Sequence, residues 1–136
     1  MCIRDSNSKC IAVIVCISYC RGLEYYELFH NSVNIPKFLS FLDGLRRQHF
    51  ADDIALFIDR LSVHRSKVVQ ERMEELGIPC IFNAAYNCDA MPCENVFAYA
   101  KKSFRERRLN WVLNGIKDDA VLNIKKSLDG IKLFDV

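Results

Sequence analysis

The sequence predicts an α/β fold with a mixed sheet and flanking helices. An apolar hairpin pattern occupies residues 10–29, and two further apolar runs, residues 54–58 and 78–82, alternate with helix patterns. An antiparallel hairpin followed by strand–helix units gives a sheet of mixed direction with helices packed on its faces. The chain has 136 residues, of which 51% are hydrophobic and 26% charged, as expected for one globular domain.

The first strand is predicted over residues 10–20, whose many β-branched side chains favour a buried strand over an apolar helix. The run is shorter than the ~20 residues that span a bilayer, and no small-residue cleavage site follows it. We therefore expect an intracellular protein that is not secreted. Gly22 predicts a turn, and residues 23–29 predict the second strand of the hairpin. Residues 1–9 show no periodicity, and we interpret them as a non-native or disordered start.

Four helices are predicted from capping residues and apolar spacing. Asn34 caps the first, whose apolar residues recur at i, i+3, i+4 and i+7. Ser66 caps the second, which Gly77 ends. A third, strongly patterned helix follows Pro92, and residues 118–128 predict a last short one.

Asp59 stands directly after the apolar run 54–58. A strand buried on both faces reads as a continuous apolar run, and in α/β sheets the chemistry lies outside the carboxyl ends of the strands. Asp59 is therefore placed like an active-site acid. Asp is also common in turns, so this segment alone leaves both interpretations open.

A second acid, Glu94, follows Asp59 after 34 intervening residues, at the start of a helix pattern. In these two segments the chain resembles the DDE-superfamily endonucleases of mariner-type transposases and related bacterial insertion sequences. That family carries Asp-Asn-x-x-x-His at a strand end and, at the same spacing, Tyr-Ser-Pro-Asp-Leu-Asn-Pro-Ile-Glu. The chain matches these motifs at Asp59, His64, Tyr86, Asp89, Pro92 and Glu94, and departs from them at Arg60, Cys88, Met91 and Cys93.

The resemblance implies an RNase H-like fold and transposase-type DNA cleavage and strand transfer, with the transposon ends and the target DNA as partners. It implies that Asp59 and Glu94 are catalytic residues and metal ligands. Such enzymes use two Mg²⁺ or Mn²⁺ ions about 4 Å apart, which activate the attacking oxygen and stabilise the leaving oxygen. Hard cations of this kind prefer oxygen ligands. We expect that the full-length protein can form a homodimer and that it has no membrane partner.

The family uses a third acid, an Asp on a strand preceding the one that here begins at Cys10, and we find no such strand in the sequence. We therefore interpret residues 10–136 as an N-terminally truncated catalytic domain, and we expect this fragment to be inactive as a nuclease. The alternative function is a catalytically inactive remnant, or an RNase H-like module co-opted to bind nucleic acid or protein.

His64 lies five residues after Asp59. A lone His is more often a structural residue than a ligand or a base. The family motif gives it an accessory role near the catalytic acid, and both interpretations stay open.

Basic residues gather in the helix that follows Pro92. The net charge of +2 is too small to indicate a nucleic-acid partner, so the distribution of charge has to carry that argument. A run of charge is usually a solvated face, and at a helix C-terminus it suits the macrodipole. In a DNA-processing protein it could instead contact phosphates. The DNA-contact candidates are Lys101, Lys102, Arg105 and Arg108.

The chain has seven cysteines, a high number for its length. The odd count, the missing secretory signal and the absence of a paired C-x-x-C motif argue against a disulfide framework and a standard zinc site. We predict buried free thiols, because free Cys behaves as a small apolar residue.

Overall fold

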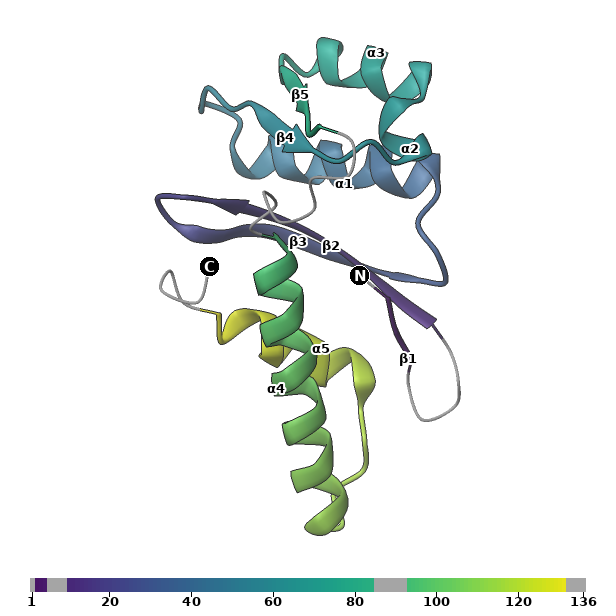
Figure 1. Cartoon of the computed structure of the whole chain (residues 1–136), viewed down its shortest axis with the longest axis vertical. Helices are drawn as coiled ribbons and strands as arrows, with labels where there is room; N and C mark the ends of the chain where they lie inside the picture. Colours follow the sequence, from purple (N-terminus) through teal and green to yellow (C-terminus); the bar gives the residue numbers. More distant parts are fainter. Residues whose placement is uncertain (1, 5–9, 85–92, 132–136) are drawn as a thin grey trace. The chain divides into compact units, whose positions relative to one another are not determined.

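The computed structural model describes residues 2–4, 10–84 and 93–131, with side chains described from residue 10 onward. The chain forms two compact units (Figure 1). Unit 1 combines Met1–Ser32 with Pro92–Val136, and unit 2 is the continuous segment Val33–Met91. In the part of the chain that the structure describes, no helix is long and apolar enough to cross a membrane.

Unit 1 contains a three-stranded antiparallel sheet in the order β1-β2-β3. Its strands are β1 (Cys2–Arg4), β2 (Cys10–Ser18) and β3 (Gly22–His30). The predicted hairpin is confirmed, and Gly22 adopts a φ of 78° after the turn, a left-handed conformation that glycine enters at little cost. Cys2–Arg4 form a strand, and the interpretation of residues 1–9 as a non-native or disordered start stays a prediction. β1 pairs through backbone groups with the edge of β2 that β3 does not occupy, and such pairing needs no side-chain periodicity.

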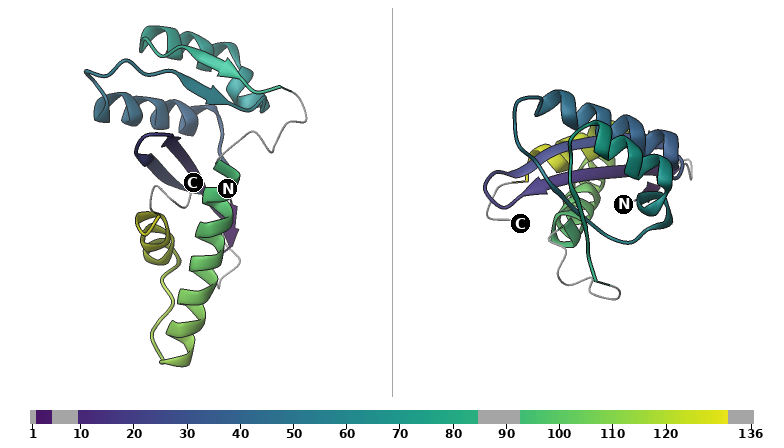
Figure 2. Two further views of the ribbon diagram at one scale, coloured as in Figure 1. Left: turned by 60° about the vertical axis from the view of Figure 1, so that its left-hand side comes forward. Right: turned by 90° about the horizontal axis from the view of Figure 1, so that it is seen from above.

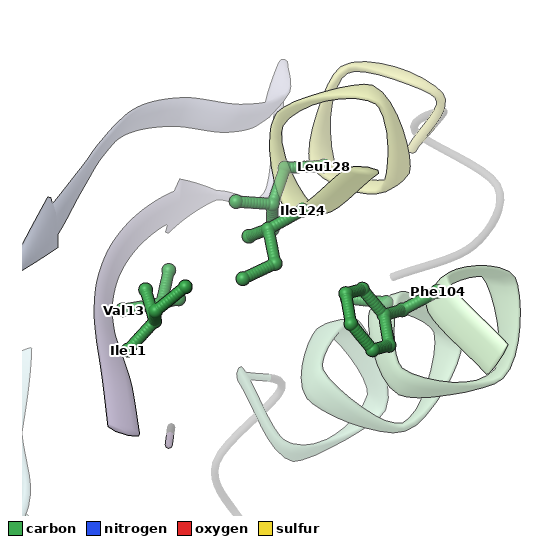
Figure 3. Packing of buried hydrophobic residues seen from close by; sticks show 6 residues of the cluster. Ile11, Val13, Phe104, Ile124 and Leu128 are labelled. Atoms are coloured by element: carbon green, nitrogen blue, oxygen red, sulfur yellow. The ribbon is translucent and has the colours of Figure 1, made fainter. Parts of the chain in front are cut away.

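Two helices, α4 (Cys93–Leu113) and α5 (Ala120–Asp129), complete unit 1 and lie side by side (Figure 2). Asp119 caps α5 by accepting a hydrogen bond from the Leu122 amide at 3.1 Å. A buried cluster joins β2 to both helices (Figure 3), and each large side chain in it contributes about 1.5–3 kcal/mol by its burial. The cluster consists of Ile11, Val13, Ala100, Phe104, Ile124 and Leu128.

Unit 2 alternates helices with two short strands. Its elements are α1 (Ile35–Gln48), β4 (Leu56–Ile58), α2 (Ser62–Arg65), α3 (Lys67–Glu75) and β5 (Cys80–Phe82). The predicted helices α1 and α3 are confirmed, and α2 is a single turn that the sequence did not indicate. β4 and β5 pair in parallel, with Leu56 opposite Cys80 and Phe57 opposite Ile81.

The caps of unit 2 are those that the sequence predicts. The Asn34 side chain accepts a hydrogen bond from the Lys37 amide at 3.1 Å, and Ser66 caps α3 in the same way. Gly77 follows α3 with a φ of 66°. The core of unit 2 is formed by α1 and α3, through the buried residues Phe38, Phe41, Leu42, Leu45, Val69 and Met73.

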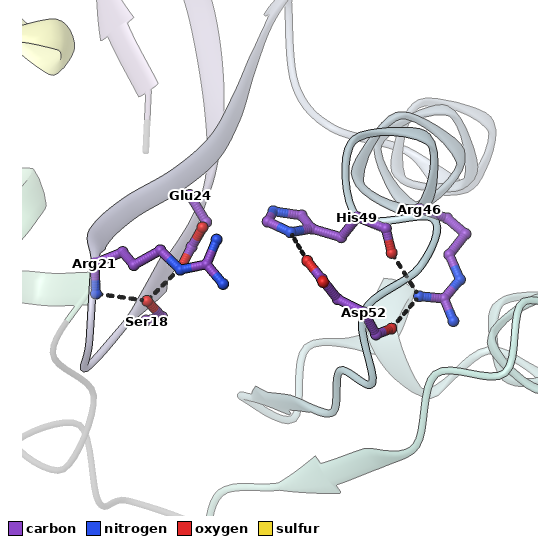
Figure 4. Close-up of polar contacts among 6 residues, drawn as sticks. All are labelled: Ser18, Arg21, Glu24, Arg46, His49 and Asp52. Atoms are coloured by element: carbon purple, nitrogen blue, oxygen red, sulfur yellow. Dashed lines mark hydrogen bonds and ion pairs between the residues drawn. The ribbon is translucent and has the colours of Figure 1, made fainter.

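Arg46 links the C-terminal ends of α1 and α3. Its Nε donates to the Leu76 carbonyl at 3.0 Å. Its Nη1 donates to the carbonyls of His49 and Asp52 at 3.1 and 3.0 Å (Figure 4). Carbonyls at a helix C-terminus have no amide partner within the helix, and Leu76 and His49 cap the C-terminal ends of α3 and α1. One guanidinium therefore stabilises two helix ends.

The single mixed sheet predicted from the sequence is replaced by two sheets. The described strands form the three-stranded sheet of unit 1 and the two-stranded β4–β5 sheet of unit 2. The apolar run 54–58 also forms less strand than expected, because β4 covers only Leu56–Ile58. Leu56 is buried, whereas Phe57 is 47% exposed, so β4 packs on one face and not on both. Phe57 and Ile81, which are opposite each other, are both exposed, so this face of the β4–β5 pair is not part of the core.

Candidate active site

Asp59 directly follows β4, at the carboxyl end of the parallel β4–β5 pair. At the same end, the Asn83 amide donates to the Ile58 carbonyl at 2.7 Å and extends the pairing beyond β5. The Asp59 side chain is 49% exposed. Its Oδ1 lies 3.5 Å from the Leu61 amide, a long contact that supports the turn interpretation only weakly. Asp59 therefore presents its carboxylate at a strand end, as the sequence predicts.

His64 contacts Asp59 directly. Its Nδ1 lies 2.7 Å from Asp59 Oδ1 and 3.2 Å from the Asp59 main-chain oxygen. The imidazole is only 16% exposed and packs on Phe38, with 4.6 Å between the ring centroids. The loop after β4 folds back through α2, and this turn brings the fifth residue after Asp59 onto its carboxylate.

Glu94 lies in the first turn of α4 and is exposed. Amides that lack helical partners and the positive end of the helix dipole favour an ionised acid at this position. The buried Val96 and Ala100 anchor this end of α4 in unit 1. Asp59 belongs to unit 2, so the expectation that the two carboxylates converge stays a prediction. The motif residues Tyr86, Cys88, Asp89, Met91 and Pro92 lie outside the described residues.

The carboxylates fit part of a cation site. Mg²⁺ and Mn²⁺ prefer oxygen donors, which Asp59 and Glu94 supply. Over residues 10–84 and 93–131, however, no three His, Cys, Asp or Glu side chains form a group that could hold a metal ion. The described side chains therefore do not by themselves provide the complete two-metal site that the resemblance implies.

The basic residues of α4 divide into two groups. Lys101, Lys102 and Arg105 are exposed, in keeping with a solvated or phosphate-contacting face. Arg108 pairs through Nε with Asp118 Oδ2 at 2.9 Å, and Arg107 donates to groups on α5. The sequence did not reveal these internal partners, because they lie on the segment that returns along α4.

The position of the basic cluster on α4 also corrects an expectation. We predicted a cluster at the helix C-terminus, where it would interact with the macrodipole. α4 instead continues to Leu113, and its last turn contains no basic residue. The cluster lies in the middle of the helix, so the macrodipole does not account for it.

The cysteines only partly follow the prediction of buried free thiols. Cys16, Cys20 and Cys80 are free thiols, but Cys20 is exposed, and Cys16, Cys80 and Cys93 are half-buried. Cys10 is disulfide-bonded, which corrects the prediction for that residue. Burial raises the pKa of Cys16 to about 12, with smaller contributions from Cys93 and Glu24. A thiol with this pKa stays protonated near neutral pH and is a poor nucleophile or metal ligand.

Solved structures share this fold. The Mos1 transposase catalytic domain, in a structure with Raltegravir and Mg, aligns with a TM-score of 0.68 and 21% identity over 95% of this chain and 75% of that chain. A chain in the simian T-cell lymphotropic virus intasome, solved with PP2A regulatory subunit B56 gamma, aligns with a TM-score of 0.69 and 14% identity over 94% of this chain. The BIV integrase catalytic core aligns with a TM-score of 0.56 and 14% identity over 94% of this chain and 77% of that chain.

The chain thus has the α/β fold of transposase and integrase catalytic cores, and the predicted resemblance is confirmed at the level of the fold. It spans 44% of the intasome chain that it matches. No protein-family model and no curated protein matches the sequence.

Proposed function

We propose that the chain is part of the catalytic domain of a DDE-type transposase, which cleaves DNA and transfers strands by metal-dependent phosphoryl transfer. The observation that carries this proposal is Asp59, a half-exposed carboxylate at the carboxyl end of β4, in a chain with the fold of the Mos1 catalytic domain. Solved Mos1 structures include a strand transfer complex and catalytic domains with Mg and with Mn.

In this proposal, Asp59 and Glu94 each provide one carboxylate to divalent cations. The bound cations would activate the attacking oxygen and stabilise the leaving oxygen. The exposed Lys101, Lys102 and Arg105 contact DNA phosphates and hold the backbone in a salt-sensitive way. Arg108, which already pairs with Asp118, is a weaker candidate for this role than the sequence suggested.

A third carboxylate is proposed to come from a strand outside these 136 residues. The β4–β5 sheet supports this part of the proposal. Sheets usually contain more than two strands, most often about four to six. The described strands β4 and β5 form a sheet of only two. An added strand would extend this sheet and supply the missing acid.

The second candidate function is a non-catalytic module that binds nucleic acid or protein. It is favoured by the lack of a three-donor metal group among the described side chains and by Arg60, which replaces the Asn of the family motif. Both functions leave the intracellular location and the homodimer of the full-length protein as predictions.

The two functions differ in what an N-terminal extension does. We expect the 136-residue chain to show little metal-dependent cleavage of DNA, and an extension encoding an apolar strand that ends in Asp, taken from the upstream reading frame, to restore it. The restored activity should be lost in Asp59→Asn and in Glu94→Gln. Matched controls are Asp53→Asn in unit 2 and Glu106→Gln on α4, which change exposed acids and should leave activity intact.

Two results would each contradict one part of the proposal. If the extended chain stays inert with all three acids present, the non-catalytic function is favoured. If the 136-residue chain already cuts DNA and Asp59→Asn abolishes the cleavage, the requirement for a further acid is wrong.

A further inference from the structure

We infer that His64 is a positioning residue for Asp59, which fixes one carboxylate oxygen by a hydrogen bond and leaves the other oxygen directed to a divalent cation. The inference rests on the proposed function, because it assigns His64 a role in the metal-binding step of Asp59. It deepens that proposal by stating which atom of the imidazole acts and in which tautomer.

The contacts of one nitrogen determine the tautomer. His64 Nδ1 lies 2.7 Å from Asp59 Oδ1 and 3.2 Å from the Asp59 main-chain oxygen. An ionised carboxylate and a carbonyl are both acceptors only. A nitrogen facing two acceptors must carry the hydrogen, so Nδ1–H donates to Asp59. The short distance to the carboxylate is typical of a charge-assisted bond.

The imidazole is held in place by its surroundings in unit 2. The ring packs on Phe38, a buried residue of α1, with 4.6 Å between centroids. Gln70 of α3 donates from Nε2 to the His64 carbonyl at 2.8 Å. His64 is therefore held in place both at its ring and at its backbone, although α2 is only one turn long.

Fixing the donor orients the acceptor. The terminal torsion of an Asp side chain is broad, and a carboxylate that is 49% exposed would otherwise rotate freely. With Oδ1 on His64, the second oxygen has no hydrogen-bond partner among the described residues. It is the oxygen available to a cation, and its direction is set before the cation binds. Hydrogen-bond partners of metal ligands typically change metal affinity 10–100-fold.

Two variants separate the hydrogen bond from the packing. His64→Phe keeps an aromatic ring against Phe38 and removes the donor. His64→Asn loses the ring but retains an N–H close to the position of Nδ1. We expect His64→Phe to weaken Mn²⁺ binding at Asp59 about 10-fold. His64→Asn should stay within about 3-fold of the wild type, even if its melting temperature falls.

The experiment uses the full chain labelled with ¹⁵N-histidine, whose three His resonances are assigned with the variants. The first readout is the tautomer of His64, which should have its hydrogen on Nδ1. The second is paramagnetic broadening during titration with Mn²⁺ alone, which detects weak binding near Asp59. Asp59→Asn should abolish this broadening, and Asp53→Asn should not.

The outcomes distinguish the inference from the proposed function. A hydrogen on Nε2 and not on Nδ1 would overturn the inference. Equal Mn²⁺ affinity in His64→Phe and the wild type, with loss in Asp59→Asn, would also overturn it while the metal role of Asp59 stands. Broadening that survives Asp59→Asn would overturn both. Broadening that is absent from the wild type would overturn the inference, while the proposed function, which places a further acid outside these 136 residues, stands. If His64→Phe does not fold, the tautomer and the affinity of His64→Asn still decide.

Discussion

Replacing Arg107 by Met should destabilise unit 1 without affecting DNA binding. Arg107 Nη1 donates to Ser127 Oγ at 3.1 Å and to the main-chain and side-chain oxygens of Asn123 at 3.3 and 3.4 Å. Asn123 and Ser127 are fully buried, so the substitution removes a cationic donor from buried acceptors. Bonds from charged groups contribute about 1.5–3 kcal/mol, and these long distances favour the lower end. Met retains the apolar packing of the arginine stem.

The expected loss of about 1.5 kcal/mol lowers the melting temperature by roughly 5 °C, measured by thermal unfolding followed by circular dichroism. Arg105→Met is the matched control, because Arg105 is exposed on the same helix. It should leave the melting temperature unchanged. It should weaken the binding of a DNA duplex and reduce the slope of log affinity against log salt concentration by about one. Equal melting temperatures for the two variants would refute the assignment of Arg107 as an internal link.

Other contacts give further tests. Asn34→Ala removes the cap of α1 and should cost about 1 kcal/mol in urea unfolding, whereas Asn34→Ser should cost far less; equal losses would contradict the capping role. Burial and a hydrogen bond to Asp129 raise the pKa of Tyr26 to about 12, so its neutral form is favoured in the folded chain. That contribution is complete below pH 10 and is lost as the pH rises toward 12; Tyr26→Phe should flatten the fall in stability there. Iodoacetamide should modify the exposed Cys20 before the half-buried, high-pKa Cys16, as mass spectrometry of peptides would show.

The sequence predicted the features that depend on nearby residues. Asn34 and Ser66 cap helices, Gly77 ends one, and the apolar stripe of α1 faces the core, because these signals act within one or two turns. The carboxylate of Asp59 at a strand end was predicted for the same reason. The run of apolar residues ahead of it fixed its position, although β4 is shorter than that run.

Features that depend on distant parts of the chain were missed or misassigned. In the sequence, Arg107 and Arg108 belong to a run of basic residues. Only the return of the chain along α4 shows that Arg107 donates to Ser127 and that Arg108 pairs with Asp118. The exposure of Phe57 could not be predicted either, since an apolar run cannot tell whether both faces of a strand are covered. The pairing of His64 with Asp59 required the turn of α2, which has no capping signal.

The discontinuous make-up of unit 1 has a consequence for how the chain folds. β2 and β3 precede the whole of Val33–Met91, whereas the helices that cover them follow it. The contact between Tyr26 and Asp129, for example, spans 103 residues. Closing so long a loop is slow, and early folding of unit 2 would shorten the flexible part of it. During synthesis, the apolar face of the β2–β3 hairpin therefore stays uncovered until α4 and α5 have been made. We expect this hairpin to be the segment from which aggregation starts when the chain is refolded at high concentration.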